Sequence, residues 1–117
     1  MSMTDQQGQG QITVQELMHR MPRAFLPDRA NGVDAVVQYN LTGAEGGDWI
    51  ITIQNGECTV AEGVASNPNM TLSADAQDYK DIITGKLNAM NAFMQGKVRL
   101  AGDLNLAMKL VNFFKMA

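Results

Sequence analysis

Apolar and polar residues alternate along the middle of the chain, and this period of two constrains the fold most. Apolar side chains occupy alternate positions from Val33 to Leu41, and the alternation resumes at Trp49, as in strands with one buried face. Asn55-Gly56 supplies the residue pair that a tight hairpin turn needs, and shorter apolar alternations follow near positions 58 and 70. These segments predict a largely antiparallel sheet with one apolar side.

Helical patterns flank the predicted strands. Thr13 and Glu16 form a capping box that starts the first helix, and Pro22 is expected to end that helix or to begin a second short one. After the fourth strand, Ser73 together with Asp75 is expected to open the next helix.

The segment Gly85–Phe114 strings two apolar helices and a strand between single glycines. Gly85 and Gly96 are expected to cap helices in the left-handed conformation rather than to bind phosphate. One helix is expected over Leu87–Gln95, and a last helix about 20 Å long is expected after Gly102. The apolar surface of this last helix is wider than one sheet can cover. A ligand, a membrane, a partner subunit or an enclosed cavity must therefore cover the rest.

The fold class predicted from this order is α+β, a five-stranded, largely antiparallel sheet with helices packed over one face. We expect one domain over residues 12–117 after a flexible tail at residues 1–11. The net charge of −3 argues against nucleic acid as a partner. Residues 75–117 carry six basic and four acidic side chains, and this net charge of +2 could help them approach an anionic lipid surface.

The sequence predicts a cytoplasmic protein. A single cysteine rules out an intramolecular disulfide and is typical of a reducing compartment. The chain shows neither a signal-peptide pattern nor an apolar run long enough to span a bilayer.

The residues that could carry chemistry favour structural roles, so we expect no catalytic residue, no metal site and no cofactor. His19 is expected to face solvent, and Cys58 is expected to point inward as a small apolar side chain. Asp75, Asp78 and Asp81 recur along a solvated helix flank rather than as an acid–base pair. No group of Cys, His and Asp residues has metal-ligand spacing.

The chain resembles the sterol carrier protein 2 (non-specific lipid-transfer) family over about residues 13–116. The resemblance rests on DWIITIQNGECTV, MTLSADAQDY and, most specifically, GKLNAMNAFMQGKVRLAGDLNLAMKLVNFF. It implies that the helices and the sheet enclose a hydrophobic tunnel for fatty acids, acyl-CoAs, sterols or phospholipids, without catalysis by the domain itself. The chain departs from the commoner pattern at Asn69, where relatives often carry Asp, and it lacks the peroxisomal terminus.

By position, the resemblance implies ten lipid-binding residues: Ile82, Leu87, Met90, Phe93, Met94, Leu100, Leu104, Met108, Leu110 and Phe114. We therefore interpret the chain as a carrier that binds, transports or presents a hydrophobic lipid, either a fatty acid, acyl-CoA, phospholipid, sterol or isoprenoid. The expected partners are a lipid ligand and a transient membrane contact, with the protein a monomer or a homodimer. The alternative is an interaction or dimerisation module, or an accessory factor that presents lipid to an enzyme, for example in isoprenoid quinone synthesis.

Overall fold

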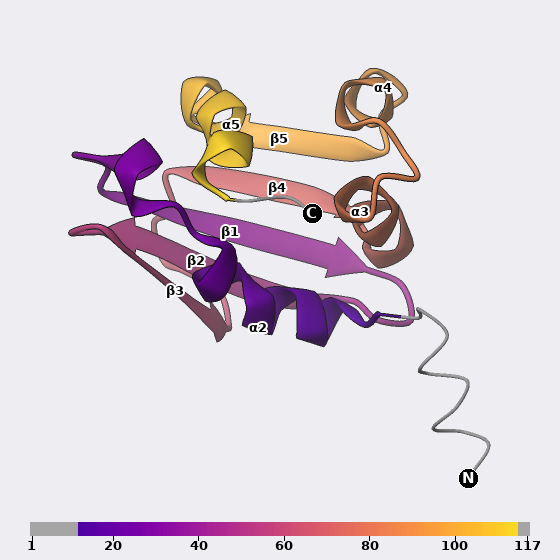
Figure 1. The fold of residues 1–117 in the computed structure, drawn as a ribbon. Helices are drawn as coiled ribbons and strands as arrows, with labels where there is room; N and C mark the ends of the chain where they lie inside the picture. Colours follow the sequence, from indigo (N-terminus) through magenta and orange to yellow (C-terminus); the bar gives the residue numbers. More distant parts are fainter. Residues whose placement is uncertain (1–11, 115–117) are drawn as a thin grey trace, which may run out of the picture.

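The computed structural model describes residues 12–114, so the predicted tail at residues 1–11 lies outside the described residues. In chain order the elements are α2 (Val14–Ala24), the 3-10 helix η1 (Pro27–Ala30), β1 (Ala35–Thr42), β2 (Gly47–Gln54), β3 (Glu57–Glu62), β4 (Met70–Asp75), α3 (Ala76–Ile83), α4 (Ala89–Met94), β5 (Val98–Gly102), α5 (Leu104–Leu110) and the 3-10 helix η2 (Val111–Phe113). The predicted α+β class is confirmed (Figure 1).

The five strands form one sheet in the order β3-β2-β1-β4-β5. Three of the four neighbouring pairs are antiparallel, and the central pair β1–β4 is parallel. The parallel pair arises because the chain leaves the edge strand β3 and crosses to the far side of β1 before β4 begins. Gln38 holds this crossing segment, since its Nε2 donates to Gly63 O at 3.0 Å and its Oε1 accepts from Ala65 N at 2.7 Å.

The predicted hairpin at Asn55-Gly56 is confirmed. Both residues adopt positive φ, 54° and 73° respectively, as a type I′ turn requires. This turn pairs Gln54 with Glu57, so Cys58 lies opposite Ile53 and both side chains are buried. The apolar side of the sheet predicted from the alternation is therefore one continuous face, which we call the front face.

The helices cover this front face in separate portions (Figure 1). The helix α2 contacts β3, whereas α3 contacts β4 and β1, and α5 contacts β4 and β5. Tyr79 on α3 fixes that helix to β1 through an edge contact with Tyr39, with ring centroids 5.4 Å apart. Both tyrosines are buried, so the contact belongs to the core.

The helix α2 starts as predicted but continues further. Thr13 Oγ1 accepts from Glu16 N at 3.1 Å and Glu16 Oε1 accepts from Thr13 N at 2.9 Å, which completes the capping box. The expectation that Pro22 ends this helix or begins another is wrong, because α2 continues through Pro22 to Ala24. A proline two residues before the end removes one helical hydrogen bond, and its fixed φ suits the helix.

The structure also corrects the start of α3. The strand β4 runs to Asp75, so Ser73 pairs with Arg99 in the sheet and does not open a helix. Asp75 alone is the N-cap, since its Oδ2 accepts from Gln77 N at 2.9 Å. Six residues of strand pairing outweigh the local capping preference of Ser73.

The glycine caps of the last third are confirmed, but its helices are shorter than expected. Gly85 and Gly96 have φ of 86° and 78°. The helix α4 starts only after its N-cap Asn88, whose Oδ1 accepts from Asn91 N at 3.0 Å. The last helix, α5, has seven residues, or about 10 Å at 1.5 Å per residue. Phe114 leaves the helical conformation and forms an isolated β-bridge with Phe25.

Candidate functional site

The front face is fully closed on the central strands and less closed around one pair of side chains on β4 and β5. Val37 and Ile51 on the central strands are completely buried. Leu72 on β4 and Leu100 on β5 pair across the sheet, yet both are only half-buried. The front face of β4 and β5 is therefore the part of the sheet where an apolar ligand could gain most from cover.

The ten residues expected to bind lipid divide into two sets. Five are buried or half-buried and pack within or against the core, and we call them the inner set: Ile82, Leu87, Leu100, Leu110 and Phe114. The other five are exposed, and we call them the outer set: Met90, Phe93, Met94, Leu104 and Met108. On α4 the residue that faces the core is Ala92, which the sequence pattern did not identify.

The chain after α5 forms a cover that is tied to the segment after α2. The rings of Phe25 and Phe114 contact each other with centroids 5.7 Å apart, and Leu26 N donates to Phe113 O at 2.7 Å. Phe25 and Leu26 were missed by the sequence reasoning because two apolar residues before a proline belong to no periodic pattern. The 3-10 helix η2 in this cover also contacts η1, the element that follows α2.

Asn69, in the segment between β3 and β4, holds the start of α5. Its Oδ1 accepts from Val36 N at 2.8 Å, and its carbonyl oxygen accepts from Asp103 N at 2.9 Å. Asp103 Oδ1 in turn accepts from Leu106 N in the first turn of α5 at 3.1 Å. An Asp carboxylate could accept the same Val36 hydrogen bond, so Asn69 keeps the structural role.

The most pronounced electrostatic feature is an ion pair with one buried partner, which the sequence did not reveal. Lys80 Nζ lies 2.8 Å from Glu45 Oε2, and Lys80 is 7% exposed. Glu45 Oε1 also accepts from Val14 N at 2.9 Å. The hydrogen bond from Lys80 is the main reason that the pKa of Glu45 is lowered. The pair thus joins the β1–β2 loop, α2 and α3, and 35 residues separate its members, so no local pattern marks it.

Burial favours the neutral forms of one thiol and two phenols in the interior. Burial raises the pKa of the Cys58 thiol to about 11 and that of Tyr39 to about 12, and burial also raises the pKa of Tyr79 well above its usual value. A thiol with a raised pKa is a poor nucleophile. His19 is exposed, and residues 12–114 contain no group of three His, Cys, Asp or Glu side chains suited to a metal ion.

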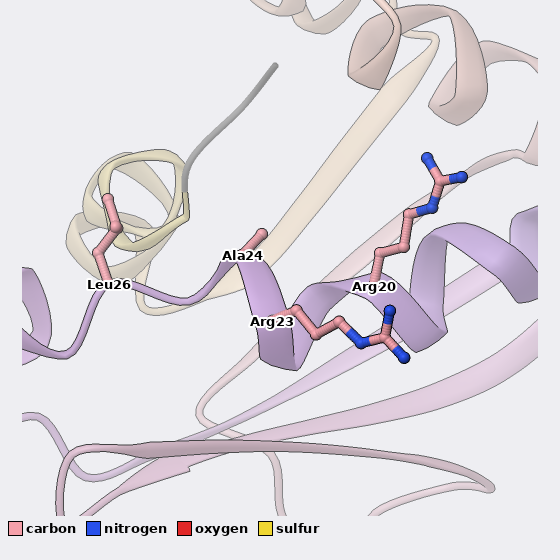
Figure 2. Close-up of a pocket in the computed structure, with 4 residues that line it drawn as sticks. All are labelled: Arg20, Arg23, Ala24 and Leu26. Atoms are coloured by element: carbon pink, nitrogen blue, oxygen red, sulfur yellow. The ribbon is translucent and has the colours of Figure 1, made fainter.

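The described residues form two surface hollows whose linings contain none of the ten expected lipid-binding residues. One, with a volume of about 350 Å³, is lined by Arg20, Arg23, Ala24 and Leu26. Figure 2 shows the two arginine side chains extending from α2 beside this hollow. The other, of about 310 Å³, lies between the start of α2 and the β1–β2 loop. The expected tunnel has no counterpart in either hollow.

The fold and this arrangement can be compared with known proteins. The model of the SCP-2 sterol transfer family matches residues 14–115. The chain belongs to this family. Lipid binding and transfer is therefore its function class, and the alternative of a pairing module without lipid is not favoured. No helix in the described part of the chain has the length and apolar character needed to cross a bilayer.

Individual relatives agree with the family assignment. The chain is 41% identical over 63 residues to peroxisomal multifunctional enzyme A of Dictyostelium discoideum. This match covers 53% of this chain and 14% of that protein. It is 33% identical over 70 residues to human sterol carrier protein 2, and the match covers 60% of this chain and 13% of that protein. The solution structure of palmitated SCP2L2 from Aedes aegypti is 30% identical, with a TM-score of 0.73 over 86% of this chain and 93% of that one. The chain thus spans about a seventh of the two curated relatives.

Proposed function

We propose that the chain binds one lipid molecule against the inner set and carries it or presents it to an acceptor. The observation that carries this proposal is the incomplete cover of the β4–β5 half of the front face. Leu72 and Leu100 are half-buried there, whereas Val37 and Ile51 on the neighbouring central strands are completely buried. A lipid chain would complete the cover after a small displacement of the residues that follow α5.

The ligand we propose is a single-chain or isoprenoid lipid. A solved relative from Aedes aegypti is described as palmitated, which makes palmitate a suitable first probe. Burial of one methylene contributes about 0.8 kcal/mol, so a chain of about 16 carbons offers about 12 kcal/mol before ordering costs. Micromolar binding needs about 8 kcal/mol. Apolar contact alone is therefore sufficient, and fatty acids, acyl-CoAs, phospholipids and sterols remain within the proposed ligand range.

An anionic head group would find its partner beside α2. Arg20 and Arg23 line the larger hollow together with the apolar Ala24 and Leu26. The combination of two guanidinium groups with apolar walls suits a carboxylate or phosphate attached to a hydrocarbon chain. We assign this hollow to the head group and the inner set to the chain.

The proposed activity is carriage in the cytoplasm and not catalysis. The buried Cys58 thiol, with its pKa of about 11, supports a non-enzymatic role because it lacks nucleophilic character at neutral pH. The single cysteine of the sequence supports a reducing compartment. The activity that the name of peroxisomal multifunctional enzyme A implies is that of the whole protein, 14% of which this chain covers.

Native mass spectrometry of the freshly purified 117-residue chain tests the proposal. We expect a monomer with one lipid bound, which organic extraction removes and added palmitate restores. A protein that is empty when purified, and that takes up no palmitate, sterol or isoprenoid afterwards, would contradict it.

A further inference from the structure

The helix α4 presents two methionines directly away from the body of the protein. Ala92 is completely buried, whereas Met90 and Met94 are 60% and 75% exposed. At 100° per residue, both methionines lie about 160° around the helix axis from Ala92. Phe93, at 45% exposure, flanks them.

The helix α5 repeats this arrangement at the other end of β5. Its buried residues are Leu106 and Leu110, one turn apart. Leu104 and Met108 are also one turn apart, on the opposite side, and are 52% and 71% exposed. Two short helices thus each expose a pair of large apolar side chains where a surface helix normally carries polar residues.

The helix α2 of the same protein shows the ordinary pattern. It buries Val14, Leu17 and Met18, and the exposed positions that follow them are His19, Arg20 and the later Arg23. The outward apolar pairs are therefore a property of α4 and α5 and not of the helices in general.

The two helices and the strand between them form one rim of the molecule. The strand β5 is an edge strand, and its chain order places α4 before it and α5 after it. Figure 1 shows α4, β5 and α5 side by side along the edge of the sheet that lies farthest from α2 and β3. We call this the β5 rim.

The β5 rim is positively charged in an acidic protein. From the start of α4 to the end of α5 the exposed charges are Lys97, Arg99 and Lys109 against Asp103, a net charge of +2. The whole chain has a net charge of −3, so the rest of it carries −5. Exposed apolar side chains among basic ones are the composition of a surface that binds anionic membranes.

A bilayer suits this rim better than a second copy of the chain does. In a two-fold symmetric dimer the rim would face itself and bring two charges of +2 together. An anionic bilayer supplies the opposite charge, and its fluid acyl layer accommodates flexible methionine side chains. The linings of the two hollows described above contain no residue of the rim.

We propose that the β5 rim docks on an anionic phospholipid bilayer, with the outer set inserted among the lipids and Lys97, Arg99 and Lys109 at the head groups. This inference rests on the proposed function and deepens it. Docking would bring the inner set to the membrane, where a carried lipid enters and leaves the protein.

Sedimentation of the full chain with vesicles tests the docking. We expect binding to phosphatidylcholine–phosphatidylserine vesicles, little binding to pure phosphatidylcholine, and weakening with salt. Met94→Glu/Met108→Glu should lower the partition coefficient by at least about tenfold, and Lys97→Gln/Lys109→Gln should lower it about fivefold per cation removed. The matched control is Val64→Glu, because Val64 is 71% exposed but lies in the segment between β3 and β4 and should change nothing.

Three results would overturn the inference. The first is equal binding of the wild type to both vesicle types, and the second is unchanged vesicle binding by Met94→Glu/Met108→Glu. The third is a wild-type dimer, seen by light scattering, that Met94→Glu/Met108→Glu converts to a monomer. Palmitate titration without vesicles separates this inference from the proposed function. A wild-type protein that binds palmitate but no vesicles refutes docking alone, whereas one that binds vesicles but no lipid ligand refutes carriage alone.

Discussion

Glu45 and Lys80 form an ion pair in which Oε2 and Nζ are 2.8 Å apart. The lysine side chain is 8% exposed and the glutamate side chain 39% exposed, so the two partners are unequal. Glu45 is on the surface and can be hydrated, but Lys80 depends on it. The same carboxylate accepts from Val14 N, so it also holds the start of α2, the helix that closes one half of the front face.

Removing the surface partner should therefore cost more stability than removing the buried one. Glu45→Ala leaves a buried ammonium without an acceptor, and we expect it to lower the free energy of unfolding by about 1–3 kcal/mol. Lys80→Met keeps the apolar stem and leaves a carboxylate that water can reach, so its loss should be smaller. Urea unfolding of both variants measures the difference, and a larger loss for Lys80→Met would contradict the assignment.

The contribution of Glu45 should also depend on pH. Its pKa is lowered in the folded protein, chiefly by the hydrogen bond from Lys80, so the folded state favours the charged form. The difference in stability between wild type and Glu45→Ala should be full above pH 4.5, the ordinary value, and should shrink as the pH falls through the lower folded value. A difference in stability between wild type and Glu45→Ala that stays constant from pH 7 to well below pH 4.5 would contradict this prediction.

Two glycines with similar backbone angles should respond differently to alanine. Gly85 and Gly102 have φ of 86° and 91°, but a Cβ on Gly85 meets open space, while one on Gly102 lies 2.5 Å from the backbone oxygen of Asn69. We expect Gly85→Ala to cost about 1–2 kcal/mol from the left-handed conformation alone. Gly102→Ala should cost about 3–4 kcal/mol because the clash adds to it. Equal losses in thermal or urea unfolding would show that the contact at Asn69 relaxes freely.

The local features of the fold could be predicted from the sequence, and the long-range ones could not. The capping box at Thr13 and the hairpin at Asn55-Gly56 are set by residues that are neighbours in the chain, and both were predicted. The ion pair of Glu45 with Lys80 depends on how the sheet brings distant segments together. No periodicity contains that information.

The candidate site shows the same limit. The ten expected residues were assigned by position from the resemblance, and neither the resemblance nor the apolar pattern separated the inner from the outer set. Ala92, and not its larger neighbours, faces the core on α4, since the small side chain allows the helix to approach the sheet. The extended Phe114 was expected in a helix, and its bridge to Phe25 decides the conformation instead.

The two arginines beside α2 should distinguish anionic ligands from neutral ones. If Arg20 and Arg23 hold a head group, the double variant Arg20→Ala/Arg23→Ala should bind palmitate about five- to tenfold more weakly and should bind cholesterol unchanged. Arg29→Ala is the control, because Arg29 is exposed on η1 and does not line the hollow. Fluorescence displacement titrations measure both affinities, and equal losses for the two ligands would argue against a head-group site.

Cys58 should resist modification while the protein is folded. Its pKa of about 11 compares with an ordinary value of 9.0, so at pH 8 about one thiol in a thousand is ionised instead of about one in ten. We expect reaction with a disulfide reagent at pH 8 to be at least about 100-fold slower in the folded protein than in urea. A folded-state rate within tenfold of the unfolded rate would show that the thiol is accessible and ionised.

The central claim is that the hydrocarbon chain of the bound lipid lies against the inner set. Photo-crosslinking with a palmitate that carries a diazirine near its methyl end tests this claim most directly. Peptide mapping should place the label on the inner set, in the peptides that contain Leu100 and Phe114, and excess unlabelled palmitate should abolish it. Competed labelling confined to the outer set, or to segments that contain none of the ten residues, would contradict the account.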